Sequence, residues 1–119
     1  MPEQSLTFAA LRAANEKRLP VFKNRRGGLA HAEPDGSDWS LNDWYTAVAG
    51  ECGELGNECK KLRRGDIELS EARELLGNEI ADVIIYLDIM AKQLNLTLDE
   101  VVRRKFNIVS KRVECDVFL

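Results

Sequence analysis

Apolar residues recur with a helical period along most of this chain of 119 residues. The period is clearest over residues 41–64, 70–94 and 98–113, and residues 6–18 are rich in the helix formers Ala, Leu, Glu and Lys. No segment shows the sustained alternation of apolar and polar residues that indicates a half-buried strand. The pattern therefore predicts an all-α fold of three long helices and a shorter N-terminal helix.

Residues suited to helix capping lie at the expected ends of these segments. In chain order they are Ser5, Ser40 with Asp43, Gly65, Asn95, and Thr97 with Glu100. Pro20 closes the first segment. Because the connections between the long segments are short, we expect the three long helices to pack antiparallel, as in a bundle, within a single domain of residues 1–119.

The stretch between the first two helices, residues 23–38, has no apolar period. It contains the runs Arg25-Arg26-Gly27-Gly28 and Pro34-Asp35-Gly36, which favour turns. We expect a mobile surface loop. Loops of this length are uncommon in compact domains, so a functional role is expected, such as a lid over a site.

Acidic residues occupy the apolar face of the first long helix. At about 100° per residue, Glu51 lies roughly 20° from Trp44 and Leu62, inside the apolar arc, and Glu54 lies at the edge of that arc. The same arc includes Cys52 and Cys59 among the expected core positions. An inward Glu51 is unusual, because burying an unpaired carboxylate costs several kcal/mol or forces its protonation.

The second long helix repeats this feature. Its segment 80–87 is apolar nearly all round, yet Glu79 and Asp82 share the face of Tyr86 and are neighbours at a separation of three residues. Four inward carboxylates need cations, and a set of oxygen ligands suits magnesium, with manganese as a substitute. The alternative is that these acids lie at helix edges and form ordinary salt bridges.

The overall composition excludes several classes of protein. The formal net charge of −3 gives no basic field for a nucleic-acid backbone, and no apolar run approaches the roughly 20 residues of a membrane span. A single histidine, His31, excludes zinc sites built on several histidines and a ferritin-like di-iron site within one chain. Three cysteines without a Cys-x-x-Cys pair favour a reducing compartment, so we expect a cytoplasmic protein.

Basic residues on the third long helix complement the acids. Lys105 and Arg112 lie on its apolar face within roughly 20° of each other, and Lys61 lies beside Glu54 on the first long helix, whereas Lys60 is expected to face away. Such cations could bind a polyphosphate whose other side is held by metal. Alternatively, Lys105 and Arg112 neutralise the buried acids or extend outward along their stems.

The two acidic motifs resemble those of the MazG-like all-α nucleoside triphosphate pyrophosphohydrolases. The match consists of Gly50-Glu51-Cys52-Gly53-Glu54, a spacer of 24 residues, and Glu79-Ile80-Ala81-Asp82-Val83-Ile84-Ile85-Tyr86, and the likeness covers residues 39–112. The family's signature is Glu-x-x-Glu, a spacer and Glu-x-x-Asp. The sequence departs from many members at Gly50, where they have a second glutamate, and at Val109, where they have asparagine.

The resemblance implies a MazG-like helical fold and Mg²⁺-dependent hydrolysis of a nucleoside triphosphate to the monophosphate and pyrophosphate. It implies metal ligands at Glu51, Glu54, Glu79 and Asp82, and phosphate contacts at Lys105 and Arg112. Under this hypothesis Glu51 or Glu54 activates water. Lys61 would be a further phosphate contact.

A nucleobase would need an aromatic or apolar wall. The candidates are Trp39, Trp44, Tyr86 and His31, although Trp44 and Tyr86 equally suit core packing and His31 a solvated loop. Because the second long helix is apolar nearly all round, we expect a homodimer or homotetramer. The alternatives for function are a phosphoribosyl-ATP pyrophosphohydrolase and a non-catalytic helical interaction module with the same fold.

Overall fold

Four α-helices and one short 3-10 helix make up the computed structural model, which describes residues 5–119. In chain order the elements are α1 (Phe8–Arg18), η1 (Leu19–Val21), α2 (Leu41–Arg64), α3 (Leu69–Gln93) and α4 (Leu98–Arg112). Within residues 5–119, strand-like pairing is limited to one isolated bridge between Lys23 and Leu29. The predicted all-α class is confirmed.

The ends of α1 and α2 follow local capping chemistry. The helix α1 begins two residues later than predicted, because Thr7 rather than Ser5 is its N-cap and accepts a hydrogen bond from the backbone N–H of Ala10. At the start of α2, Ser40 and Asp43 form the predicted reciprocal capping box. Gly65 ends α2 in the left-handed conformation at φ 81°.

The ends of α3 and α4 also lie close to their predicted positions. The helix α3 begins at Leu69, one residue early, and ends at Gln93. Asn95 then turns the chain at a positive φ of 57°. Thr97 caps α4 by accepting a hydrogen bond from the backbone N–H of Glu100. Local sequence therefore fixes all four helices to within two residues at each end.

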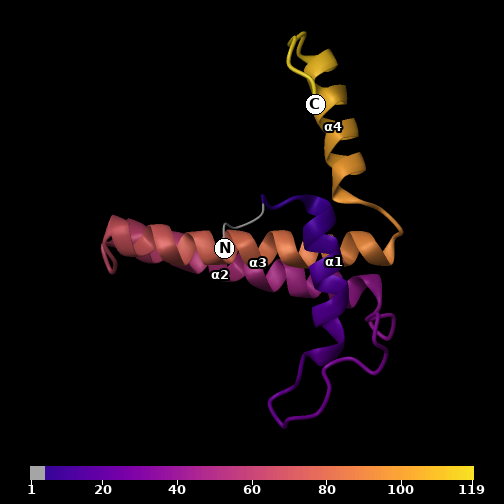
Figure 1. Cartoon of the computed structure of the whole chain (residues 1–119). Helices are drawn as coiled ribbons and strands as arrows, with labels where there is room; N and C mark the ends of the chain where they lie inside the picture. Colours follow the sequence, from indigo (N-terminus) through magenta and orange to yellow (C-terminus); the bar gives the residue numbers. More distant parts are fainter. Residues whose placement is uncertain (1–4) are drawn as a thin grey trace.

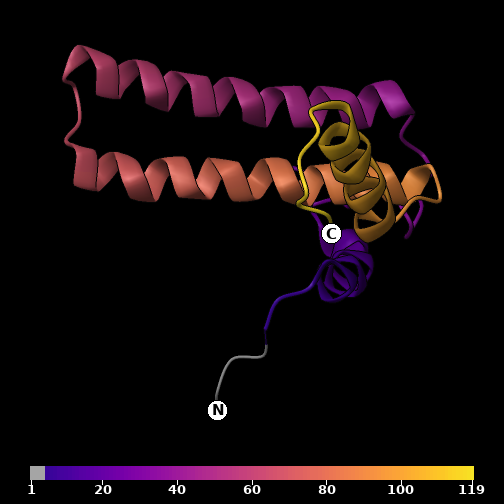
Figure 2. The ribbon, with the colours of Figure 1, turned by 90° about the horizontal axis from the view of Figure 1, so that it is seen from above.

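The helices α2 and α3 form a long antiparallel pair, as Figures 1 and 2 show. The prediction that the third long helix joins this pair in a bundle is wrong, because α4 stands out from the pair and contacts α1 instead (Figure 1). The direction of α4 depends on contacts between segments that are far apart in the sequence. The Arg12 side chain on α1 donates hydrogen bonds to the backbone carbonyls of Leu96, at 2.8 Å, and Asp88, at 3.2 Å, so α1 holds the connection that leads into α4.

The core lies where α1 and η1 cross the α2–α3 pair. Its fully buried apolar residues are Leu19, Trp44 and Ile89. Beside them, Asp88 is 1% exposed and is bound by Arg12, at 3.1 Å, and by the side-chain amide of Asn15, at 2.9 Å. These hydrogen bonds compensate the burial of the Asp88 charge and anchor α1 on α3.

Residues 23–38 form an irregular segment, which is anchored on the core at several points. His31 is only 7% exposed, although a solvated position was one expectation for it. Gly36 is buried at φ 74° against Trp44. The Asp38 carboxylate accepts hydrogen bonds from the backbone N–H groups of residues 32 and 33, and Gln93 on α3 donates to the carbonyl of Asp35.

Much apolar surface on α3 and α4 stays uncovered in the single chain. Ile80, Ile84 and Leu87 form a stripe on α3 and are each 41–49% exposed. The prediction that Cys52 and Cys59 lie in the core is wrong, since both are exposed on α2. One helix packed against α2 leaves these positions open, whereas a full bundle would cover them. No helix within residues 5–119 combines the length and apolar character that a membrane crossing requires.

Candidate metal centre

Three carboxylates meet between α2 and α3. One oxygen from each of Glu51, Glu79 and Asp82 lies within 4.8 Å of the others, and all three residues are half-buried. Glu79 and Asp82 are one helical turn apart on α3, and the antiparallel packing brings Glu51 of α2 opposite them. Three of the four acids that the sequence placed on inward faces are thus brought together.

The fourth acid, Glu54, is exposed and lies outside this triad. It remains close enough to act electrostatically, because its carboxylate raises the pKa of both Glu51 and Glu79. Glu54 and Glu79 also line the same polar cavity. Glu54 therefore lies beside the triad, where its carboxylate is free to bind a further cation or a water molecule.

The triad carries negative charge that the protein leaves uncompensated. Burial, together with the neighbouring carboxylates of Glu54, Asp82 and Glu79, raises the pKa of Glu51 to about 7. Burial, with Glu54 and Asp82 acting in the same direction, also raises the pKa of Glu79, and the Glu51 carboxyl partly opposes this shift. The Oε2 atoms of both glutamates are buried without a hydrogen-bond partner. Such atoms are costly unless a proton or a cation reaches them.

This arrangement fits a divalent metal ion. All donors are carboxylate oxygens, the ligand type preferred by Mg²⁺ and Mn²⁺. The unpartnered oxygens of Glu51 and Glu79 supply direct positions for an ion. Three protein ligands would leave the remaining coordination positions of such an ion open to water or to another ligand.

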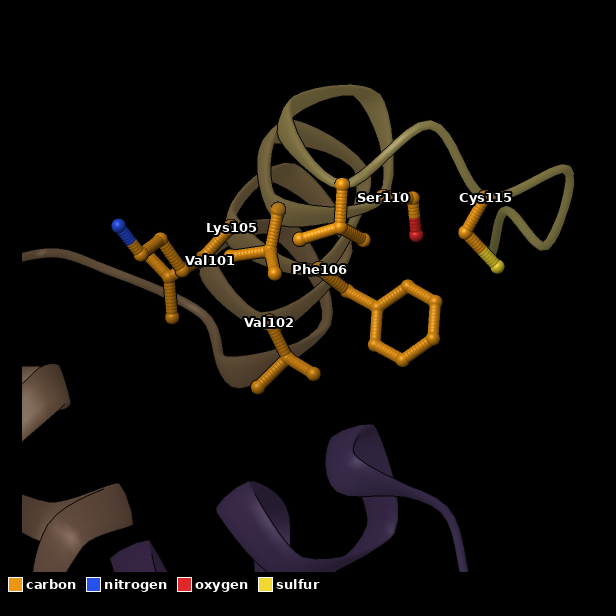
Figure 3. A pocket seen from close by; sticks show the side chains of 8 residues that line it. Val101, Val102, Lys105, Phe106, Ser110 and Cys115 are labelled. Atoms are coloured by element: carbon orange, nitrogen blue, oxygen red, sulfur yellow. The ribbon is translucent and has the colours of Figure 1, made fainter.

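The predicted basic residues divide between two places. Lys61 lines the polar cavity beside the triad, and its Nζ lies 3.0 Å from Oε1 of Glu58. Lys105 and Arg112 are exposed on α4, and Lys105 lies along an apolar groove of that helix (Figure 3). Because α4 stands out from the α2–α3 pair, its cations are not brought to the carboxylates of their own chain.

The four predicted base-pocket residues form one aromatic cluster. The rings of Trp39 and Trp44 have centroids 4.7 Å apart, His31 lies 4.7 Å from Trp39, and Tyr86 lies 6.4 Å from Trp44. Trp44 is 0% exposed and packs in the core, so its role there is structural. Trp39 is half-buried and lines an open cavity of about 440 Å³ with Asp43 and other residues of α2.

Tyr86 connects this cluster to the triad. Burial raises the pKa of its phenol, and the carboxylates of Glu51 and Asp82 act in the same direction. The aromatic cluster and the carboxylates therefore lie next to each other along α2 and α3.

Sequence reasoning missed two basic residues beside the triad. Lys60, expected to face away, lines the polar cavity together with Arg64. The sequence signal for them was the dense run of basic residues at the end of α2. Basic residues are common at the negative end of a helix dipole, so this run did not by itself indicate a site. The buried pair Arg12–Asp88 left no signal at all, because its partners are 76 residues apart.

Comparisons with protein-family models, with curated proteins and with solved structures returned no match to this chain.

Proposed function

We propose that this protein is a magnesium-dependent nucleoside triphosphate pyrophosphohydrolase of the MazG-like class. The observation that carries the proposal is the approach of Glu51, Glu79 and Asp82 to within 4.8 Å, with buried oxygens that lack partners. These residues belong to the Glu-x-x-Glu and Glu-x-x-Asp motifs of that class. In the reaction, water attacks the triphosphate, the bond between its α- and β-phosphates breaks, and pyrophosphate leaves.

The metal ligands would be Glu51, Glu79 and Asp82, with Glu54 beside them. When bound, Mg²⁺ or Mn²⁺ neutralises phosphate charge and lowers the pKa of coordinated water. Glu51 or Glu54 positions the attacking water and accepts its proton. Lys61 stabilises negative charge on the departing pyrophosphate.

The nucleobase would lie at the N-terminal end of α2. Trp39 offers a half-buried ring that borders an open cavity, with the buried Trp44, Tyr86 and His31 rings supporting it from behind. Ala47 of that cavity is one helical turn from Glu51, so a base there would continue into phosphates at the triad.

Self-association is the second part of the proposal. The α3 stripe of Ile80, Ile84 and Leu87 is exposed, and α4 carries an apolar groove of about 510 Å³ on which Val102 and Phe106 lie (Figure 3). A second copy of the chain would cover both surfaces in a homodimer or homotetramer. Lys105 and Arg112 could then contact phosphate only across such an interface.

A panel of nucleotides tests the enzyme activity by pyrophosphate release with Mg²⁺. We expect turnover of at least one nucleoside triphosphate, and loss of about 100-fold or more in Glu79→Gln and Asp82→Asn. Glu71→Gln, an exposed position on α3, is the matched control and should retain activity. Activity that persists in EDTA or in both triad variants would contradict the proposal.

The same panel separates the alternatives. Turnover of phosphoribosyl-ATP alone would identify the related pyrophosphohydrolase. Absence of turnover together with absence of binding of Mg²⁺ and a non-hydrolysable nucleotide in calorimetry would favour a non-catalytic module.

Light scattering of the purified chain tests self-association. We expect the mass of a dimer or tetramer for the wild type, and a shift toward the monomer for Ile84→Glu or Phe106→Glu. Leu29→Glu, at an exposed apolar position outside α3 and α4, is the control. A monomeric wild type would contradict this part of the proposal while leaving the triad untouched.

A further inference from the structure

A polar cavity of about 340 Å³ lies beside the triad, along the C-terminal half of α2. Three carboxylates line it, from Glu54, Glu58 and Glu79. Three cationic side chains line it as well, from Lys60, Lys61 and Arg64. Because Glu79 belongs both to this cavity and to the triad, the cavity continues the metal centre. Its volume is within the range of about 300–1,000 Å³ found for small-ligand sites.

The charges in this cavity are only partly paired with each other. Lys61 bonds Oε1 of Glu58 at 3.0 Å, and Arg64 bonds Asp66, outside the cavity, at 2.6 Å. Lys60 forms no ion pair among the described residues. On the acidic side, Oε2 of Glu58 and Oε2 of Glu79 are buried without partners. Both signs of charge are thus available to a ligand.

This mixture selects a particular kind of ligand. A free anion would meet three carboxylates, and a free cation would meet three basic side chains, so each would be opposed by half of the lining. A polyphosphate carrying a divalent cation matches both halves, since its cation faces the carboxylates and its phosphate oxygens face Lys and Arg.

The order of residues along α2 gives the ligand a direction. At about 1.5 Å per residue, Glu51 lies about 10 Å beyond Trp44, and Lys61 lies about 15 Å beyond Glu51. The aromatic cluster, the carboxylates and the basic residues therefore follow one another along one helix. Phosphates held at the carboxylates by a divalent cation would extend their terminal groups toward the basic end.

We propose that this cavity is the subsite for the terminal diphosphate of the substrate, with Lys60, Lys61 and Arg64 as its contacts. The inference rests on the proposed function and specifies it, because it assigns the departing pyrophosphate to bases of α2 rather than to those of α4. Glu58 is a positioning residue that holds Lys61 at the cavity.

Calorimetry with inorganic pyrophosphate and Mg²⁺ tests the assignment on the full chain. We expect Arg64→Gln and Lys60→Gln to raise the Kd for pyrophosphate by about tenfold, the effect of losing one charged contact. Arg63→Gln is the matched control, because Arg63 is exposed in the same helical turn and does not line the cavity. Binding of a nucleoside monophosphate, which lacks the terminal phosphates, should be unchanged in all three variants.

An equal loss in Arg63→Gln and Arg64→Gln would overturn the assignment, because it would reduce the effect to net charge. The assignment would also be overturned if Arg64→Gln or Lys60→Gln weakened monophosphate binding as much as pyrophosphate binding. The hydrolysis assay separates this outcome from failure of the proposed function. If the wild type hydrolyses a triphosphate and Arg64→Gln leaves KM unchanged, only the subsite is wrong; if the wild type hydrolyses none, the proposed function itself fails.

Discussion

Glu51 on α2 and Glu79 on α3 approach each other with carboxylate oxygens within 4.8 Å, and each retains one buried oxygen that no hydrogen-bond donor reaches. Two ionised carboxylates at this separation repel, and burial strengthens the repulsion. Burial of the Glu51 carboxyl and, after it, the neighbouring carboxylates favour its protonated form, which is why the pKa of Glu51 rises to about 7. Protons and a divalent cation bound at the triad would therefore compete for one site.

The stability of the metal-free protein should fall as the pH rises from about 4.5 to above 7. The pKa of Glu51 is raised from 4.5 in the unfolded chain to about 7 in the folded one, so over this range the folded state binds more protons. By linkage, the stability that protonated Glu51 contributes is fully present below 4.5 and is lost through pH 7. Thermal unfolding in EDTA measures the fall, and saturating Mg²⁺ should reduce it.

Glu51→Gln is the control for this pH dependence, because an amide cannot ionise and keeps the shape of the side chain. Its unfolding curve in EDTA should vary less with pH between 4.5 and 7 than that of the wild type. A wild-type stability that rises over this range in EDTA would contradict the electrostatic account of the triad.

Magnesium binding should release protons. At pH 6.5 Glu51, with a pKa of about 7, is mostly protonated in the metal-free protein, and a metal ligand must be ionised. We expect release of roughly half a proton or more per chain, read from calorimetric titrations in buffers of different ionisation enthalpy. The release should shrink by pH 8.5. A binding heat independent of buffer at pH 6.5 would exclude Glu51 as a ligand.

The buried Asp88 should be essential for stability although it lies outside the proposed site. Asp88→Ala removes the partner of Arg12 and Asn15 and leaves the Arg12 guanidinium, 18% exposed, without its ion pair. We expect a loss of about 3–5 kcal/mol in the free energy of unfolding, measured with denaturant. Asp66→Ala removes an exposed ion pair with Arg64 and should cost about 1 kcal/mol or less.

Gly36 should tolerate no side chain. A Cβ there would lie 2.8 Å from Cζ2 of Trp44 and 2.9 Å from Cδ2 of Leu19, and φ is +74°. Gly36→Ala should therefore destabilise the fold by about 1–3 kcal/mol and loosen residues 23–38 from the aromatic cluster. Gly56→Ala, at an open position in α2, should instead stabilise by about 0.5–1 kcal/mol. Chemical denaturation of the two variants measures these opposite changes in the free energy of unfolding.

Sequence alone determined the helices, because their ends depend on residues a few positions apart. The Ser40–Asp43 box, Gly65 and Thr97 each act within a single turn, so no distant contact is needed to recognise them. The same local geometry identified the inward carboxylates. At a fixed rotation per residue, Glu51, Glu79 and Asp82 fall on apolar faces, and pairing α2 with α3 is enough to bring them together.

Only the tertiary structure decided the direction of α4 and the surroundings of the triad. The path from α3 into α4 depends on hydrogen bonds from Arg12 to Asp88 and Leu96, which lie 76 and 84 residues away. Those bonds turn Lys105 and Arg112 away from the carboxylates of their own chain. The burial of His31 and the cavity beside Glu79 likewise depend on how separate segments pack. Helical periodicity records the face that a residue occupies, whereas packing between distant segments determines what that face meets.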